Sequence, residues 1–287
     1  MEEIMNKIAI VTDSTAYLPP EAVQKYNIHV LPLKLHWKGE TYLDGVEIKP
    51  RDFYTQLGNG APIPTTSQPA MSEFLDIYTD LAEQYEGILV PLISSGISGT
   101  VSSAQAAAKE FDQVPVEVID SRITSGGLAL VVLAACRAIE SGAGLSEAAR
   151  VARSVSERVR AYFVVDTLEY LHKGGRIGGA SRYLGSALRI KPILTFTEEG
   201  TIDALERIRT KRKAIERLLE LIKEHADGRP IHAGVVHAHA EDALQELTTQ
   251  LNGCVSCKEL QQYELSPVIG AHVGPGTLGV TFYTDGK

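Results

Sequence analysis

The chain has 287 residues, of which 44% are hydrophobic, and its net charge is −8. This acidic balance argues against a protein that tracks a nucleic-acid backbone, because such a protein needs a clustered basic surface. The longest apolar run, residues 128–136, is too short to span a bilayer, and residues 1–11 lack the pattern of a signal peptide. We therefore expect a cytoplasmic globular protein with one large domain or two of ordinary size.

The first half of the chain alternates between short apolar segments and amphipathic segments. Strands are predicted at 7–13, 28–37, 87–93 and 114–120, and helices at 19–26, 72–85, 99–111, 127–142 and 145–159. Apolar strands separated by helices indicate a mostly parallel sheet that is covered by helices on both faces. The sequence therefore predicts an N-terminal α/β domain over residues 1–160.

The pattern changes after residue 160. Strands are predicted at 161–167, 231–238, 255–265 and 276–284, helices at 168–179, 211–225 and 241–251, and a hairpin at 191–210. Antiparallel pairing combined with helices predicts a second α/β domain, with a mixed sheet, over residues 161–287. No low-complexity linker separates the two halves.

Four stretches rich in Ser and Thr adjoin predicted strands or helices of the first half. They lie at residues 12–15, 65–69, 94–100 and 120–127. Each stretch by itself is explained by Ser and Thr acting as helix N-caps. Ligands of parallel sheets bind at the carboxyl ends of the strands, so four such stretches at one edge favour a binding site. Hydroxyls and free N–H groups at a helix start suit a carboxylate or a phosphate.

A serine hydrolase or acyltransferase is the alternative function for the stretch at 94–100. In that reading Ser98 is the nucleophile and His272 its base. The segment around Ser98 lacks the complete G-x-S-x-G elbow that presents a nucleophilic serine. An anion-binding loop therefore fits the residues better than a nucleophile does.

Three further motifs resemble known sites but stand in the wrong context. Residues 274–279 match G-x-G-x-x-G, yet a strand is predicted to follow them, where a dinucleotide fold needs a helix. Cys254 and Cys257 form a C-x-x-C pair in a segment that alternates like a strand. His237 and His239 could begin a metal site, but no third ligand follows at a suitable spacing. We expect no nucleotide, redox or metal chemistry and no cofactor.

Seven motifs in chain order resemble the DegV family of bacterial fatty-acid-binding proteins. They are VTDSTAYLP, PTTSQPAMSEF, ISSGISGTVSSA, VIDSRITSGG, LEYLHKGGRIGG, IKPIL and HVGPGTLGV. Each motif is weak by itself, but seven in the same order over nearly the whole chain are specific. The resemblance implies two α/β domains that hold a long-chain fatty acid, such as palmitate, in an apolar tunnel closed by the C-terminal domain.

The resemblance also implies that the chain is a carrier and not an enzyme. In the family, hydroxyl groups hold the carboxylate, and a separate kinase related to dihydroxyacetone kinases phosphorylates it to an acyl phosphate. The carboxylate ligands fall on Thr66, in T-S-Q-P, and on Ser98, in S-G-T. His272, in H-V-G-P-G, acts through water or positions the head group, and Ser95 is a neighbouring candidate.

Two arginines are candidates for contact with the kinase or with the acyl phosphate. Arg176 stands between two glycine pairs and is expected to be exposed and mobile. Arg209 belongs to the basic stretch at 207–213, which is the local exception to an acidic chain. A solvated surface is the alternative explanation for both.

Overall fold

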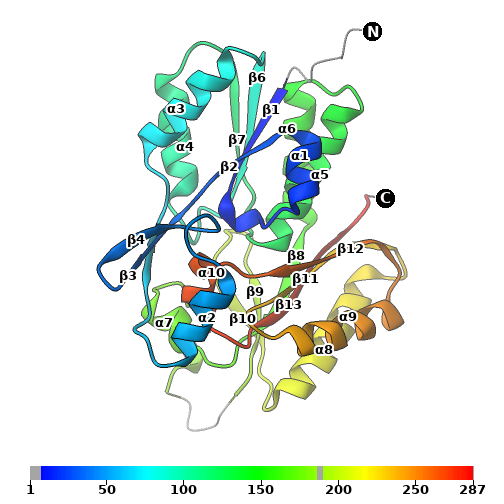
Figure 1. Ribbon diagram of the computed structural model, residues 1–287. Helices are drawn as coiled ribbons and strands as arrows, with labels where there is room; N and C mark the ends of the chain where they lie inside the picture. Colours follow the sequence, from blue (N-terminus) through cyan, green and yellow to red (C-terminus); the bar gives the residue numbers. More distant parts are fainter. Residues whose placement is uncertain (1–7, 186–189, 287) are drawn as a thin grey trace.

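The first half of the chain builds a four-stranded parallel sheet in the order β2-β1-β6-β7 (Figure 1). The computed structural model describes residues 8–185 and 190–286. The strands of this sheet are β1 (Ile8–Asp13), β2 (Ile28–Leu31), β6 (Gly87–Leu92) and β7 (Val116–Asp120). Every residue of β6 is buried, as expected for a central strand with both faces covered.

Helices cover both faces of this sheet, because successive side chains of a strand point to opposite faces. Ala9 and Val11 face one pair of helices, and Ile10 faces the other. The first pair is α3 (Met71–Ala82) and α4 (Thr100–Glu110). The second is α5 (Gly126–Glu140) and α6 (Leu145–Arg158), with α1 (Pro20–Tyr26) beside them. The predicted parallel sheet with helices on both faces is confirmed.

The second half builds a six-stranded mixed sheet in the order β10-β9-β8-β13-β11-β12. Its strands are β8 (Arg160–Val164), β9 (Ile193–Phe196), β10 (Ile202–Glu206), β11 (Ile231–His237), β12 (Cys257–Glu264) and β13 (Leu278–Thr284). The β11 and β12 strands pair in parallel, and the other neighbours pair antiparallel. One face packs against α8 (Lys211–Ala226) and α9 (Glu241–Cys254). The predicted mixed sheet is confirmed.

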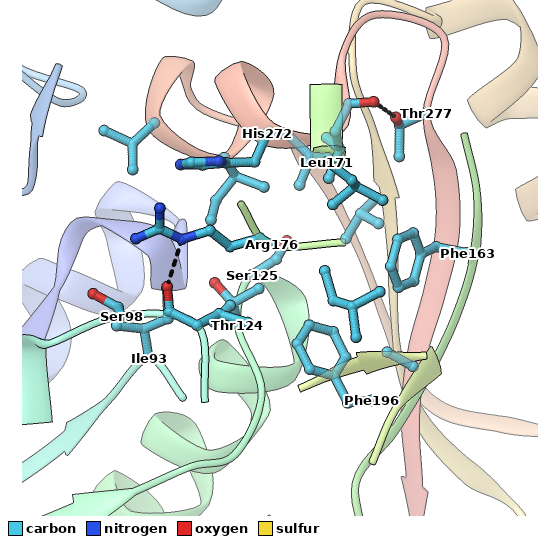
Figure 2. Close-up of a pocket in the computed structure, with 18 of the residues that line it drawn as sticks. Ile93, Ser98, Thr124, Ser125, Phe163, Leu171, Arg176, Phe196, His272 and Thr277 are labelled. Carbon is cyan, nitrogen blue, oxygen red and sulfur yellow. Dashed lines mark hydrogen bonds between the residues drawn. The ribbon is translucent and has the colours of Figure 1, made fainter. Parts of the chain in front are cut away.

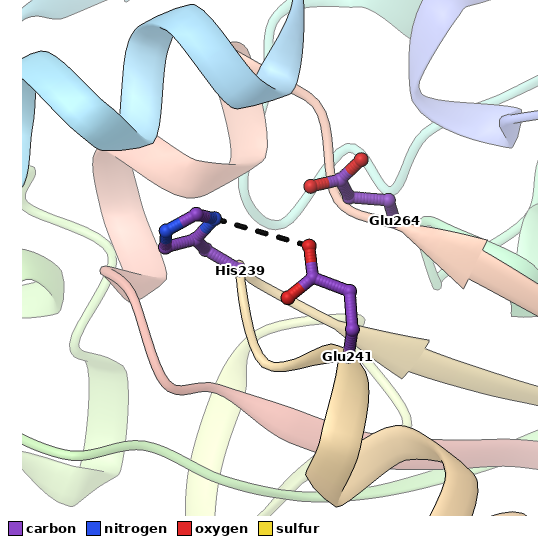
Figure 3. Close-up of side chains that lie close together, drawn as sticks. All are labelled: His239, Glu241 and Glu264. Carbon is purple, nitrogen blue, oxygen red and sulfur yellow. Dashed lines mark ion pairs between the residues drawn. The ribbon is translucent and has the colours of Figure 1, made fainter.

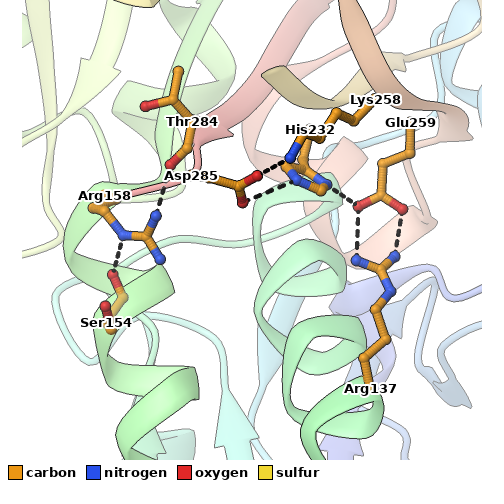
Figure 4. A network of polar contacts seen from close by, with 8 residues as sticks. All are labelled: Arg137, Ser154, Arg158, His232, Lys258, Glu259, Thr284 and Asp285. Atoms are coloured by element: carbon orange, nitrogen blue, oxygen red, sulfur yellow. Dashed lines mark hydrogen bonds and ion pairs between the residues drawn. The ribbon is translucent and has the colours of Figure 1, made fainter. Parts of the chain in front are cut away.

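The α5 helix packs against both sheets. It contacts β1 and β6 of the parallel sheet and β11, β12 and β13 of the mixed sheet. Twelve of its fifteen residues are buried, which explains why its sequence is apolar around nearly the whole helix. Near its carboxyl end, Arg137 makes a bidentate ion pair with Glu259 of β12, and Glu259 also accepts from His232 Nδ1 at 2.7 Å (Figure 4). These contacts attach the two sheets to one shared helix.

The prediction of one strand over 28–37 is wrong. The chain leaves the parallel sheet after β2, and a second strand begins at Lys34. Pro32 has no N–H with which to continue the ladder. The chain re-enters a small antiparallel sheet of order β4-β3-β5. Its strands are β3 (Lys34–Trp37), β4 (Glu40–Leu43) and β5 (Thr65–Ser67). The helix predicted at 168–179 is also shorter, with α7 (Glu169–Lys173) ending before the glycines and the 3-10 helix η2 (Gly178–Tyr183) following.

Two helices were not predicted, and one of them carries a candidate site residue. They are α2 (Pro50–Gly58) and α10 (Pro267–Val273), which pack against each other. A buried carboxylate fixes the start of α10: Asp44 Oδ2 accepts from Ser14 at 2.8 Å and from Ser266 at 2.7 Å, and Asp44 Oδ1 accepts from the N–H of Val268 at 3.2 Å. Burial raises the pKa of Asp44 to about 6. These bonds connect the first Ser/Thr-rich stretch to the helix that bears His272.

Candidate functional site

A cavity lies between the mixed sheet and the carboxyl edge of the parallel sheet. It contains about 870 Å³ of atom-free space, including the open solvent at its mouth. The mixed sheet, α7 and α10 supply most of its wall, and the loops after β6 and β7 supply much of the rest, together with β5 and its neighbours. The wall is mainly apolar, with side chains that include Phe163, Leu171, Phe196, Val236, Ile269 and Val280.

Polar side chains gather toward one end of this cavity. Figure 2 shows Ser98, Arg176 and His272 toward one side of the view and the rings of Phe163 and Phe196 toward the other. Thr66 lines the same cavity and contacts His272. The structure therefore brings Thr66, Ser98 and His272 to one cavity, although they come from a strand, a loop and a helix.

His272 is held by Thr66 and by a close glycine. Thr66 Oγ1 and His272 Nε2 are 2.8 Å apart. Burial, assisted by the positive charge of Arg176, lowers the pKa of His272 to about 4, so the imidazole is neutral at pH 7. A Cβ at Gly174 would lie 2.2 Å from His272 Nδ1, so a residue with a side chain does not fit there. The glycine pair after α7 thus allows the close approach of His272.

Ser98 lies on a loop that both halves of the chain hold in place. Its Oγ is 2.8 Å from Thr100 Oγ1 and accepts from the N–H of Thr100 at 3.4 Å. At the start of the loop, the N–H of Ile93 donates to Asp13 Oδ2 at 2.7 Å. Ser94 Oγ donates to the carbonyl of Gly200, in the turn between β9 and β10, at 2.8 Å.

The geometry required of a serine nucleophile is absent among the described residues. Ser98 is hydrogen-bonded to Thr100, and His272 to Thr66, with no hydrogen bond between Ser98 and His272. His272 Nδ1 is buried and has no partner, so no carboxylate orients the ring as in a catalytic triad. The site is equipped to hold an anion and poorly equipped to activate a serine.

The expectation that Arg176 is exposed is wrong. Its side chain is partly buried at the polar end of the cavity, where Nε donates to the carbonyl of Ile97 at 3.0 Å and Nη1 to the carbonyl of Gly174 at 2.8 Å. A guanidinium therefore stands near the hydroxyls, which makes this end positive as well as polar. Arg209 is exposed between β10 and α8 and does not line the cavity.

Ser95 also lies outside the cavity wall. It is exposed, and its Oγ and N–H both bind the carboxylate of Asp120, at 2.5 and 3.1 Å. Among the residues that line the cavity but were not predicted as site residues are Thr124 and Ser125. The signal was present, because both belong to the Ser/Thr-rich stretch at 120–127, but nothing in the sequence distinguished them from the other hydroxyls there.

The remaining motifs form no comparable site. His237 is buried and its Nδ1 accepts from the N–H of Ala240 at 3.1 Å. His239, Glu241 and Glu264 place ligand atoms within 4.8 Å of one another, but His239 and Glu241 are exposed on an open surface (Figure 3). Among the residues that the structure describes, no other group of His, Cys, Asp and Glu side chains is arranged to hold a cation.

The glycine-rich and cysteine motifs are structural elements. Gly276, at φ +79°, belongs to the turn that leads into β13, so the motif at 274–279 runs into a strand and not into a helix. Cys254 ends α9 and Cys257 begins β12, and burial raises the pKa of both thiols. A raised pKa is unfavourable for a reactive thiolate. Within residues 8–185 and 190–286, none of the helices combines the length and hydrophobicity needed to cross a bilayer.

Comparison with known proteins gives matches over almost the whole chain. Protein DegV of Bacillus subtilis is 38% identical over 275 residues, covering 95% of this chain and 98% of the relative. A DegV domain-containing protein of Streptomyces coelicolor is 40% identical, covering 95% and 97%.

Solved structures agree with these relatives. A fatty-acid-binding DegV family protein from Thermus thermophilus superposes with a TM-score of 0.92 at 37% identity, covering 97% of this chain and 100% of that chain. DegV of Bacillus subtilis, described as a fatty-acid-binding protein, gives 0.89 at 37% identity, covering 97% and 99%. The family model described as "Uncharacterised protein, DegV family" matches residues 7–285. The chain therefore belongs to the DegV family.

Proposed function

We propose that the chain binds one long-chain fatty acid in the cavity and acts as a carrier, not as a catalyst. The observation that carries the proposal is an apolar cavity with hydroxyls, a neutral imidazole and a guanidinium gathered at one end. The similar proteins from Thermus thermophilus and Bacillus subtilis, each described as fatty-acid-binding, support it. In this proposal residues 1–160 and 161–287 are two domains, and the second closes an apolar tunnel around the tail.

Most of the affinity comes from the tail. Each methylene removed from water contributes about 0.8 kcal/mol, so a chain of about sixteen carbons contributes on the order of 12 kcal/mol before the costs of ordering. Phe163, Phe196 and the aliphatic side chains around them supply the apolar surface. The main role of the polar end is then to orient the carboxylate, and its contribution to the affinity is smaller.

The hydrogen bonds at the polar end leave two hydroxyl protons for the carboxylate. When His272 carries its proton on Nε2, it donates to Thr66 Oγ1, and the Thr66 hydroxyl proton is free. When Thr100 donates to Ser98 Oγ, the Ser98 proton is free in the same way. Thr66 and Ser98 are thus the proposed direct ligands, His272 and Thr100 position them, and Arg176 adds a positive charge.

The second part of the proposal concerns a partner. We place this chain as the carrier for a separate kinase, related to dihydroxyacetone kinases, that phosphorylates the bound carboxylate in the cytoplasm. Neutral donors hold the carboxylate without a tight ion pair, which leaves oxygen electron density for attack on a phosphoryl donor. Arg176 at the cavity end and the exposed Arg209 are the proposed contacts with the kinase or the acyl phosphate.

Thr66→Val tests the head-group site, because valine removes the hydroxyl with little change in size. We expect the Kd for palmitate to rise roughly tenfold, as a hydrogen bond to a carboxylate is lost. Thr65→Val is the matched control, since Thr65 is the exposed neighbour in the same strand and does not line the cavity. Calorimetric titration of lipid-free protein measures both. Equal affinity of Thr66→Val and the parent contradicts the assignment.

Arg209→Ala tests the kinase contact. Because Arg209 lies outside the cavity, we expect palmitate binding at the parent level and several-fold slower acyl-phosphate formation with a fatty acid kinase of the dihydroxyacetone-kinase type. Arg150→Ala removes an exposed arginine from α6 and serves as the charge control. Parent-level turnover of Arg209→Ala would remove this residue from the docking surface.

The buried His272 makes the lipid-free protein sensitive to acid. Its pKa is lowered from 6.5 to about 4 in the folded state, so the unfolded chain binds more protons between these values. The free energy of unfolding therefore falls as pH drops through this window. Between pH 7 and pH 5, the free energy of unfolding of His272→Gln should fall by roughly 1–2 kcal/mol less than that of the parent. Urea unfolding at the two pH values measures this difference. An identical pH dependence in both proteins counts against the neutral buried imidazole.

A further inference from the structure

Two buried hydroxyls in the cavity wall have no hydrogen-bond partner. Thr124 and Ser125 are 8% and 4% exposed, and both of their oxygens are buried without a partner among the described residues. The other Ser and Thr side chains of the wall do have partners. Thr66 contacts His272, Ser67 contacts His36, Ser98 contacts Thr100, Thr277 donates to the carbonyls of Val273 and Gly274, and Thr281 donates to the carbonyl of Gly234.

The Ser125 hydroxyl lines the cavity and does not cap the helix that follows. Ser125 immediately precedes α5, where a serine ordinarily caps the helix, yet its side chain makes no capping bond. Its φ of +58° is unusual for a residue with a side chain. At the next position, a Cβ on Gly126 would lie 2.8 Å from Thr281 Oγ1 and 3.0 Å from the ring of Tyr263, so the chain is closely confined.

The two hydroxyls belong to the loop after β7, whereas the proposed carboxylate ligand Ser98 belongs to the loop after β6. In the view of Figure 2, Thr124 and Ser125 lie between Ser98 and the rings of Phe163 and Phe196. A tail that extends from Ser98 toward those rings passes them. A saturated tail offers them neither a donor nor an acceptor, and a buried hydroxyl left unpaired is unfavourable. The positive end of α5 favours an oxygen at the same place.

We propose that Thr124 and Ser125 form a second polar subsite, which selects a fatty acid carrying a hydroxyl or keto oxygen part-way along its chain. The inference rests on the proposed binding of a fatty acid and adds its chemical class. A ligand oxygen accepts from both hydroxyls, and a ligand hydroxyl can also donate to one of them. A site built to hydrogen-bond a ligand oxygen discriminates against the analogue that lacks it.

The test compares acids of equal length on lipid-free protein. Stearate is titrated beside hydroxystearates whose hydroxyl stands near the carboxyl end, near the middle or near the methyl end. We expect at least one isomer to bind at least roughly fivefold more tightly than stearate, the effect of one neutral hydrogen bond. In the double variant Thr124→Val, Ser125→Ala this ratio should fall to about one, because both hydroxyls are gone.

Ser121→Ala is the matched control. Ser121 lies on the same loop, but its Oγ donates to the carbonyl of Ile123 and it does not line the cavity, so the ratio should stay at the parent value. If stearate binds as tightly as every isomer, or if the preference survives in the double variant, the subsite is refuted. If the double variant does not fold, the test rests on whether the parent chain binds a hydroxystearate more tightly than stearate. Binding of no fatty acid at all refutes the proposed function together with this inference.

Discussion

The burial of α5 between two sheets is the constraint on which the cavity depends. An apolar helix covered on nearly every side cannot move relative to either sheet without exposing its core, and Arg137 with Glu259 adds a bidentate ion pair at its carboxyl end. Its amino end is thereby fixed at the cavity wall, next to Ser125. The α5 helix thus contacts both sheets, and the cavity lies between the carboxyl edge of the parallel sheet and the face of the mixed sheet.

Polar contacts across that space refine the arrangement. Asp44 fixes the start of α10, Thr66 contacts His272 near its end, and Ser94 contacts the turn between β9 and β10. Each contact joins segments that are far apart in sequence. The site therefore exists only in the assembled molecule, and its hydrogen bonds stabilise the fold as well as arrange the polar end of the cavity. Thr124 and Ser125 differ from these residues, because their buried hydroxyls have no hydrogen-bond partner among the described residues.

The sequence predicted the layers of the fold because their periodicity is strong. Buried strands between amphipathic helices indicated the parallel sheet, and the change of pattern after residue 160 falls in β8, which begins at Arg160. The break between β2 and β3 was missed, because Pro32 lies inside an otherwise continuous strand-like run. The α10 helix was missed because its seven residues are almost all buried and show no amphipathic period.

The candidate site was only partly readable from the sequence. Thr66, Ser98 and His272 came from the resemblance, since no local pattern brings together Thr66 and His272, which are 206 positions apart. The position of the Arg176 side chain could not be predicted either, because it donates to the carbonyl of Ile97 on another loop. Whether the Thr124 and Ser125 hydroxyls have hydrogen-bond partners depends on all the residues that surround them. Their lack of partners could therefore be found only in the structure.

Mass spectrometry of the purified protein after denaturing extraction tests the central claim most directly. The account predicts about one intact, non-covalently held long-chain fatty acid per chain and an unmodified polypeptide. Recovery of protein that neither contains nor takes up a fatty acid would contradict it. An acyl adduct on Ser98 would contradict it as well, because a covalent intermediate belongs to a hydrolase or an acyltransferase and not to a carrier.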